Sequence, residues 1–219
     1  MEPPKKKYHR FSRWEVGQTH PIKVTPRDLE YLYRLFIHGP LSSAMLHQLI
    51  SPEVEHRQTS ERLKLLRHHP NCLVEVPKQL RLSYNANYQH LTCKITNTGV
   101  QVLLSKGRIS AEVADLWFRL QQNYRTFHHD ALTAYITASI EFGCRGGQMA
   151  ARFFGWDYIF THPKTPQETK QSDNPLRISY VIDGKEKALV PDALFAIETL
   201  EGKICFALGS GPIKVLALR

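Results

Sequence analysis

Three short amphipathic segments follow one another over residues 25–67, and this order limits the possible folds more than any other feature. Thr25-Pro26 provides an N-cap and a first-turn proline, and Gly39-Pro40 ends the segment that they begin. Between these signals the apolar side chains recur at helical spacing, at Leu29, Leu32, Leu35 and Phe36. The stretch "LSSAMLHQLI" predicts a second helix, capped by Ser42 or Ser43, and "RQTSERLKLLRHH" predicts a third.

Two apolar runs, "CLVEVP" and "HLTCKI", come next and predict two strands joined by the loop "KQLRLSYNANYQ". A helix, a helix–turn–helix and a β-hairpin in this order resemble a winged helix–turn–helix. In that fold the third helix enters the major groove of DNA, and the loop between the strands reaches the backbone or the minor groove. A small α+β domain that binds another protein is the alternative, and the pattern alone does not separate DNA from RNA. The stretch "TNTGVQVLLSKG" predicts one more helix.

The positive charge of the chain is concentrated in its amino-terminal half. The 219 residues carry a formal net charge of +9, and the pI is near 9.4. Residues 1–108 contain 17 Lys or Arg and 8 Asp or Glu, whereas residues 109–219 contain 12 of each kind. A basic excess confined to one half indicates that this half alone meets a polyanion. A solvated basic surface that only aids solubility is the alternative.

Polar and basic side chains in three segments are the candidates for DNA contact. The third predicted helix turns its leucines inward, and its other sides offer Arg57, Gln58, Thr59, Arg62 and Lys64. We expect Gln58 and Thr59 to read base edges and the cations to contact phosphates. In the predicted hairpin, Lys78 and Arg81 reach phosphates. The arm "MEPPKKKYHRFSRW" follows a minor groove or the backbone through Lys5, Lys6, Lys7, Arg10 and Arg13.

The second half is predicted to combine two helices with several strands. The stretches "SAEVADLWFRLQQNYRTF" and "HHDALTAYITASIEFG" have helical spacing, and the second would bury Leu132, Tyr135, Ile136 and Ile140. Strands are predicted for "WDYIF", "RISYVI", "EKALVPDALFAIE" and "ICFAL", with a hairpin turn at Asp183-Gly184 and an exposed loop over 161–176.

The predicted fold class is α+β, in three parts. Residues 1–22 form a basic flexible arm, and residues 23–108 form the winged helix–turn–helix. Residues 109–219 contain a linker helix and an α/β domain with a small mixed sheet.

Three side chains of the second half indicate a vestigial metal-dependent site. His129 opens a helix, Glu141 lies near its end, and Asp192 follows a proline at the start of a predicted strand. In the PD-(D/E)xK nuclease fold, such an aspartate and an acid on the next strand hold Mg²⁺, which activates water. A carboxylate that caps a turn and a packed histidine are the alternatives. No metal site is therefore assigned, and Mg²⁺ is expected only if Asp192 forms a functional site.

The combination of these segments resembles the plasmid replication–relaxation protein family of bacterial mobile elements. The resemblance covers residues 25–208, and "HHDALTAYITASIE" and "VPDALFAIETLEGKICFAL" are its most specific parts. It implies a winged helix followed by a PD-(D/E)xK-like α/β domain. Members of the family continue with an acidic "LExDRGT" motif, where this chain has "LGSGP" over residues 208–212. Gly-Ser-Gly-Pro-Ile over residues 209–213 can be encoded GGA-AGC-GGA-CCG-ATC, and removing one G from the first of these codons yields Glu-Ala-Asp-Arg. We therefore expect a frameshifted, truncated carboxy terminus.

The sequence therefore predicts a cytoplasmic DNA-binding protein of plasmid or mobile-element replication, relaxation or mobilisation. Because the second acidic motif is absent, no metal-dependent activity and no cofactor are expected. The expected partners are double-stranded DNA and either a second copy of the chain or plasmid replication and mobilisation proteins. The sequence has no CxxC pair and no run of about 18 apolar residues, so neither a zinc module nor a membrane span is predicted. A Mg²⁺-dependent nuclease or nickase and a winged-helix transcriptional repressor are the alternatives.

Overall fold

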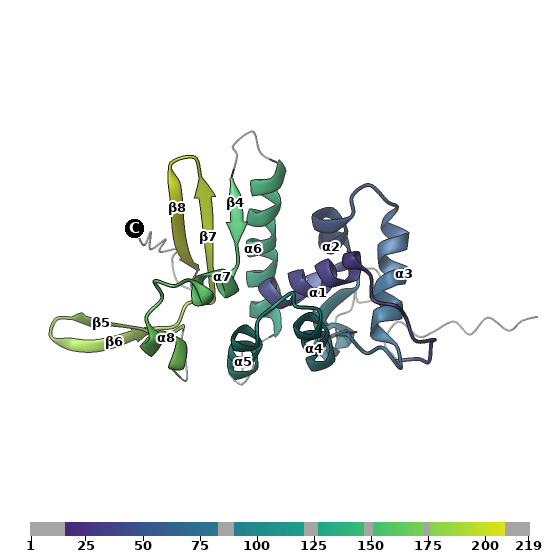
Figure 1. Cartoon of the computed structure of the whole chain (residues 1–219), viewed down its shortest axis with the longest axis horizontal. Coiled ribbons are helices and arrows are strands. Elements are labelled where there is room, and N and C mark those ends of the chain that lie inside the picture. The colour runs from purple at the N-terminus through teal and green to yellow at the C-terminus, as the bar shows by residue number, and fades with distance from the viewer. Residues whose placement is uncertain (1–15, 83–89, 121–126, 147–150, 173–175, 209–219) are drawn as a thin grey trace, which may run out of the picture.

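The computed structural model describes residues 16–82, 90–120, 127–146, 151–172 and 176–208, which form an α+β protein (Figure 1). Within these residues there are eight α-helices, one 3-10 helix and small antiparallel sheets. The elements of the amino-terminal half are α1 (Pro26–His38), β1 (Leu41–Ser42), α2 (Ser43–Ile50), α3 (His56–Arg67), β2 (Val74–Glu75), the 3-10 helix η1 (Lys78–Leu82), β3 (Thr92–Ile95) and α4 (Asn97–Ser105).

Helix α1 begins and ends where the sequence predicts. The Thr25 hydroxyl accepts a hydrogen bond from the Asp28 N–H at 3.2 Å, and the Asp28 carboxylate accepts one from the Thr25 N–H at 2.7 Å. Pro26 occupies the first turn, and at the other end the Gly39 N–H donates to the Leu35 carbonyl. The predicted apolar stripe faces the core, and α1 is therefore the central helix of the amino-terminal half.

Helices α2 and α3 follow, and a small sheet packs beside them. The Ser42 hydroxyl caps α2 by accepting from the Met45 N–H at 3.2 Å, so one of the two predicted caps is confirmed. The three strands are antiparallel in the order β1–β3–β2, with Leu41 opposite Cys93. The sequence does not predict β1, because two residues are too few to show strand periodicity.

The elements of the carboxy-terminal half are α5 (Ala111–Leu120), α6 (Phe127–Gly146), β4 (Arg152–Phe154), α7 (Trp156–Thr161), α8 (Gln167–Gln171), β5 (Ile178–Ile182), β6 (Lys185–Leu189), β7 (Ala193–Thr199) and β8 (Gly202–Leu208). Strands β4, β7 and β8 form one sheet in the order β4–β7–β8, and β5 pairs with β6. Every strand pair in the described residues is antiparallel, so the prediction of a mixed sheet is wrong.

The predicted strand "WDYIF" is also wrong, because these residues begin helix α7. Gly155 is the N-cap, and Asp157 lies in the first turn, where a negative charge stabilises a helix. Trp156 and Phe160 are four residues apart and therefore share one face of the helix. The short helix α8 lies inside the segment that the sequence predicts as a loop.

The predicted hairpin at Asp183-Gly184 is confirmed, but the single predicted strand "EKALVPDALFAIE" is divided into β6 and β7, which belong to different sheets. Asp183 and Gly184 have φ values of 52° and 70°, and this left-handed backbone is the reason that Asp-Gly favours a two-residue turn. Thr199 pairs with Gly202 at the turn between β7 and β8. Figure 1 shows the β5–β6 hairpin extending away from the rest of the molecule, whereas the β4–β7–β8 sheet lies against α6.

Helix α6 buries a different face from the one that the sequence predicts. Its buried side chains are Ala134, Thr137, Ala138 and Glu141. Leu132 and Tyr135 are 61% and 58% exposed, and Ile136 and Ile140 are half-buried. The small residues let α6 pack closely against α1, α2 and β4. Hydrophobic size alone therefore identifies the wrong face of this helix.

One hydrophobic core spans both halves of the chain. The Phe36 ring of α1 stacks on Trp117 of α5 with 6.0 Å between ring centroids, and it lies 5.1 Å from the ring of Trp156 in α7. The predicted domain boundary at residues 108 and 109 lies in the connection between α4 and α5. No helix in the described ranges is both long and apolar enough to cross a membrane.

Candidate nucleic-acid interface

Helix α3, the predicted DNA-contacting helix, is held against α1 and α2 by buried hydroxyl groups. The Tyr31 hydroxyl lies 2.8 Å from Ser51 Oγ and 3.2 Å from Thr59 Oγ1, and the two latter atoms are 3.2 Å apart. His47 Nδ1 lies 3.1 Å from Thr59 Oγ1. These hydroxyls are removed from water and satisfy one another. The network therefore fixes the orientation of α3 relative to the two helices before it.

An ion pair between the half-buried Arg62 and the buried Asp28 attaches α3 to the start of α1. Arg62 donates from Nε and Nη2 to the two carboxylate oxygens of Asp28 at 2.8 and 2.6 Å, and Nη2 also donates to the Lys23 carbonyl. Burial is the largest effect on Asp28 and raises its pKa. The hydrogen bonds from Arg62 and Thr25 together outweigh burial and hold the pKa of Asp28 below its ordinary value.

These contacts change the set of residues on α3 that are predicted to contact DNA. Thr59 is 1% exposed and Arg62 is bound to Asp28, so we withdraw both from the predicted set. They turn inward because α1 and α2 supply polar partners for them, which a count of apolar residues does not reveal. Arg57 and Gln58 are exposed, and Lys64 is exposed beside Glu61, with 2.7 Å between Nζ and Oε1. The solvent-facing side of α3 therefore presents Arg57, Gln58 and Lys64.

The other predicted DNA-contacting residues lie in the hairpin and the arm. Lys78 is exposed at the start of η1, and Arg81 belongs to the same 3-10 helix. The arm residues lie outside the described part of the chain, and they are Lys5, Lys6, Lys7, Arg10 and Arg13. Of the predicted DNA contacts, the structure thus places Arg57, Gln58, Lys64 and Lys78 at the surface.

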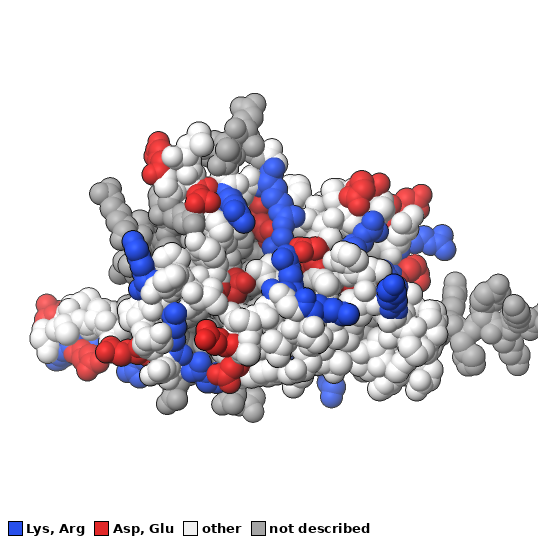
Figure 2. All heavy atoms as spheres, viewed as in Figure 1, with Lys and Arg blue, Asp and Glu red and all other residues white. Residues whose placement is uncertain are grey.

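Charged side chains of both signs are scattered over the face of the molecule seen in Figure 2, between larger areas of uncharged residues. Lys and Arg side chains run across the region of α6 and α1, with Asp and Glu among them, and the two signs alternate over α2 and α3. Several cations of the amino-terminal half have acidic partners, as in the pairs Arg27–Glu53 and Lys94–Glu75. On this face the chain therefore offers local cations rather than one continuous basic surface.

Three histidine rings meet beside α3, and no sequence motif predicts this group. The ring of His56 lies 5.4 Å from that of His47 and 5.1 Å from that of His90, both edge to face. Burial, followed by the charges of His90 and His47, lowers the pKa of His56. The three residues come from α2, α3 and the segment before β3, and their positions in the chain follow no motif.

In the second half, two of the three predicted site residues lie together. His129 Nε2 lies 3.2 Å from Asp192 Oδ2, and His129 Nδ1 lies 3.9 Å from Asp130 Oδ1, which is too long for a hydrogen bond. His129 is in the first turn of α6, and Asp192 directly precedes β7. The pair therefore joins the start of the helix to the start of the strand.

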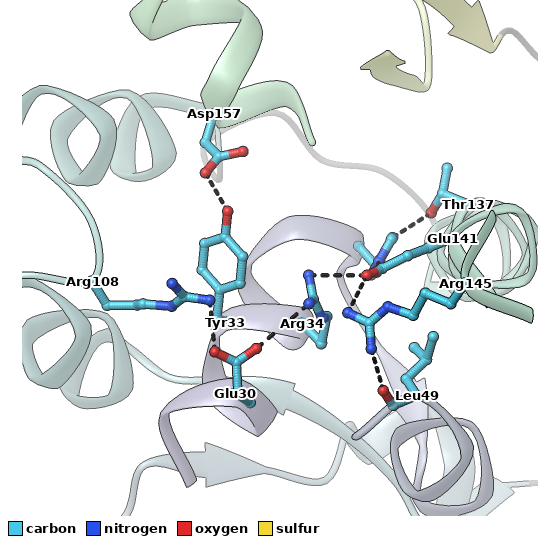
Figure 3. Close-up of polar contacts among 10 residues, drawn as sticks. Glu30, Tyr33, Arg34, Leu49, Arg108, Thr137, Glu141, Arg145 and Asp157 are labelled. Atoms are coloured by element: carbon cyan, nitrogen blue, oxygen red, sulfur yellow. Dashed lines mark hydrogen bonds and ion pairs between the residues drawn. The ribbon is translucent and has the colours of Figure 1, made fainter. Parts of the chain in front are cut away.

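Glu141 belongs to a separate polar network that joins the two halves (Figure 3). Its Oε2 lies 2.7 Å from His38 Nε2, and its Oε1 lies 3.1 Å from Arg34 and 2.6 Å from Arg145. Burial raises the pKa of Glu141, but the His38 hydrogen bond and the two guanidinium groups outweigh it and lower the pKa. Both carboxylate oxygens are engaged, so we withdraw Glu141 from the three candidate residues of the vestigial site.

The same network extends over α1 and α7. Arg108 donates to Glu30 Oε1 at 2.6 Å, and the Tyr33 hydroxyl of α1 donates to Asp157 Oδ2 of α7 at 2.6 Å. Arg145 of α6 also donates to the carbonyl of Leu49 in α2. The helix that orients α3 is therefore bonded to the second half at several points along its length.

Within the described ranges, no group of three or more His, Cys, Asp or Glu side chains could hold a metal ion. No family model, curated protein or solved structure matches this chain. The resemblance to the replication–relaxation family therefore stays a prediction, and the function has to be argued from the geometry of the site.

Proposed function

We propose that this protein binds duplex DNA through a winged helix–turn–helix formed by residues 23–108. The succession α1–β1–α2–α3–β2–β3 and the antiparallel strand order β1–β3–β2 support this form of the fold. In the proposed complex α3 lies in the major groove, and the segment between β2 and β3 lies against the DNA backbone. The basic excess of residues 1–108 supports a polyanionic partner.

The observation that carries the proposal is the contrast between the two sides of α3. Its inner side is fixed by the Arg62–Asp28 ion pair and by the hydroxyl group of Thr59. Its outer side presents long polar side chains to solvent. Base readout requires such an arrangement, because side chains reach the bases with useful geometry only from a rigidly held helix.

The exposed residues have distinct roles in the proposed complex. Arg57 and Lys64 contact phosphates and supply affinity that depends on salt. Gln58 carries no charge and reads a base edge, for which adenine is the usual partner of glutamine. Lys78 contacts a phosphate from the hairpin side. Because Lys64 already pairs with Glu61, its contact with DNA replaces an existing surface ion pair.

We further propose replication, relaxation or mobilisation of a plasmid or mobile element as the setting, in the cytoplasm. A homodimer or a complex with plasmid replication or mobilisation proteins would extend the contact to two half-sites. The resemblance of the sequence supports this setting. The engagement of Glu141 by two guanidinium groups favours DNA binding over Mg²⁺-dependent cleavage by Asp192 with Glu141.

Fluorescence anisotropy with labelled duplexes tests the proposal. We expect the logarithm of the affinity to fall linearly with the logarithm of the salt concentration. Arg57→Ala and Lys64→Ala should each weaken binding about fivefold and reduce the salt slope by about one. Lys185→Ala makes the same charge change on the β5–β6 hairpin and should leave both quantities unchanged. Circular dichroism confirms that each variant is folded.

Gln58→Ala separates base readout from charge. We expect it to reduce the preference among duplex sequences while the salt slope stays that of the unmodified chain. Duplexes from plasmid origins and from promoters distinguish a replication protein from a repressor. Binding that does not respond to salt, or that the α3 variants leave intact, would contradict the proposal.

A further inference from the structure

A cavity of about 610 Å³ lies between the two halves of the molecule, away from the exposed side of α3. Its walls come from the end of α1, β3, α5, the first half of α6, the β4–α7 corner and the start of β7. Its volume lies within the range of about 300–1,000 Å³ that is usual for small-molecule sites. Both halves of the chain are needed to form it.

Aromatic rings make up much of the cavity wall. They belong to Phe36, Trp117, Phe127, Phe153, Trp156 and Phe195. Neighbouring rings hold one another in place, since Phe36 stacks on Trp117 and Phe153 stacks on Phe195 at 5.6 Å. A strongly hydrated ion would lose its water here without replacement, whereas a flat apolar molecule gains ring contacts.

The charged groups of the wall favour a cation. Asp130 and Asp192 both line the cavity, on the side where α6 begins and β7 starts. Lys94 also lines it, but its ammonium group pairs with Glu75 at 2.9 Å. Burial lowers the pKa of His38, which leaves this lining residue uncharged at neutral pH. Asp192 Oδ2 also lies 3.2 Å from Nε2 of His129, which does not line the cavity. With two carboxylates and one ammonium group the lining is net negative, and a positive charge is attracted to it.

We propose that this cavity binds a small organic cation, an aromatic or alkyl amine with one protonated nitrogen. The apolar body of the amine lies among the aromatic rings, and its ammonium group reaches the carboxylates of Asp130 and Asp192. Aromatic faces attract a cation through their quadrupole, so the same wall that holds the apolar body also stabilises the charge. Helix α1 contributes to the cavity wall and also holds α3 through Asp28 and Tyr31.

Three probes with one ring system separate the charge from the apolar body: 1-naphthylmethylamine, 1-naphthylmethanol and 1-naphthylacetate. Isothermal titration calorimetry with the full chain at pH 7 measures each affinity. We expect the amine to bind about tenfold more tightly than the alcohol and the acetate to bind most weakly, because a charge–carboxylate contact in a partly enclosed site adds about that factor.

Amino-acid substitutions test whether Asp192 causes the preference of the cavity for the amine over the alcohol. Asp192→Asn keeps the side-chain shape, and we expect it to weaken amine binding about tenfold while alcohol binding stays unchanged. Unchanged alcohol binding also shows that the variant is folded. Asp183→Asn, in the β5–β6 turn, is the matched control and should leave all three affinities unchanged. Thr133→Trp places a large ring in the cavity and should abolish binding of the amine and the alcohol.

Three outcomes would overturn the proposal. They are binding of no probe, equal binding of the amine and the acetate, and an amine preference that Asp192→Asn leaves intact. The titrations contain no DNA, so their result is separate from that of the DNA-binding test. A chain that binds the amine but no duplex contradicts only the proposed function, and the reverse result contradicts only the cavity proposal.

Discussion

His38 is completely buried between the two halves, with Thr137 Oγ1 2.9 Å from Nδ1 and Glu141 Oε2 2.7 Å from Nε2. Burial is the main cause of its lowered pKa, and it outweighs the Glu141 carboxylate, which raises the pKa. A neutral imidazole donates one proton, and the ionised carboxylate is the acceptor for it. Nε2 therefore donates to Glu141, and Nδ1 accepts from the Thr137 hydroxyl.

The pH dependence of stability follows from this arrangement. Below about pH 6.5 the unfolded chain protonates His38, while the folded protein keeps it neutral. The unfolded state then binds more protons, so the free energy of unfolding decreases as the pH falls, by up to about 1.4 kcal/mol per pH unit for this group. We expect His38→Gln to flatten the curve between pH 6.5 and 5 in urea titrations.

A control variant and the titration of Glu141 also bear on how the free energy of unfolding depends on pH. His20→Gln replaces an exposed histidine and should leave the slope unchanged. The pKa of Glu141 is lowered in the folded state, so its contribution is present above its ordinary pKa and is lost as the pH falls through the folded value. A His38→Gln variant with an undiminished slope between pH 6.5 and 5 would show that His38 is not held neutral.

At the scale of elements, α6 shows that packing partners and not hydrophobic size decide which face is buried. Ala134 is fully buried close to Gly39, where a Cβ atom built on the glycine would lie 3.8 Å from the Ala134 Cβ. Because Ala134 is fully buried, a larger side chain there requires its neighbours to move. The exposed Leu132 and Tyr135 lie on the other side of the helix.

Substitutions on the two faces of α6 should differ in their effect on stability. We expect Leu132→Gln and Tyr135→Gln each to change the free energy of unfolding by less than about 0.5 kcal/mol, because both side chains are exposed. Ala134→Leu should destabilise the protein by about 1–3 kcal/mol through overpacking. Urea unfolding measures all three. A loss of more than about 2 kcal/mol for Leu132→Gln would show that the apolar face is covered in solution.

Features that depend on neighbouring residues, such as helix caps and tight turns, were predictable from the sequence. Features that depend on contacts with residues far away in the chain were not. The Thr25 cap of α1 and the turn at Asp183-Gly184 depend on neighbouring residues, and both are as predicted. The inward position of Arg62 depends on Asp28, which is 34 residues away, and no local pattern reports it. The exposed Arg57 and Gln58 of the candidate site were identified because the pattern within one helix indicates them. The histidine group around His56 was missed because its rings come from three separate segments of the chain.

At the scale of the whole molecule, the two halves share one core and one polar network. Phe36 contacts both Trp117 and Trp156 across the predicted boundary, and Tyr33 donates to Asp157. Removing the second half would expose these side chains of α1 to water. The amino-terminal half therefore depends on the rest of the chain for part of its stability.

We expect the full chain to unfold in a single cooperative transition. Far-ultraviolet circular dichroism reports the helices of both halves. In a Trp14→Phe variant, fluorescence reports Trp117 and Trp156 at the junction, so the two urea curves of this variant should coincide. A fragment of residues 1–108 should unfold at a lower urea concentration than the full chain. Two separate transitions in the full chain, or a fragment as stable as the full chain, would show that the halves are independent.

The network around Glu141 also has a consequence for how such a chain can change over generations. Glu141 lies in the second half, whereas its partners Arg34 and His38 lie in the first. Recombination that exchanged only the amino-terminal half for that of another protein would remove Arg34 and His38 from this buried carboxylate and leave Arg145 beside it. We therefore expect Arg34, His38 and Glu141 to change together among related chains.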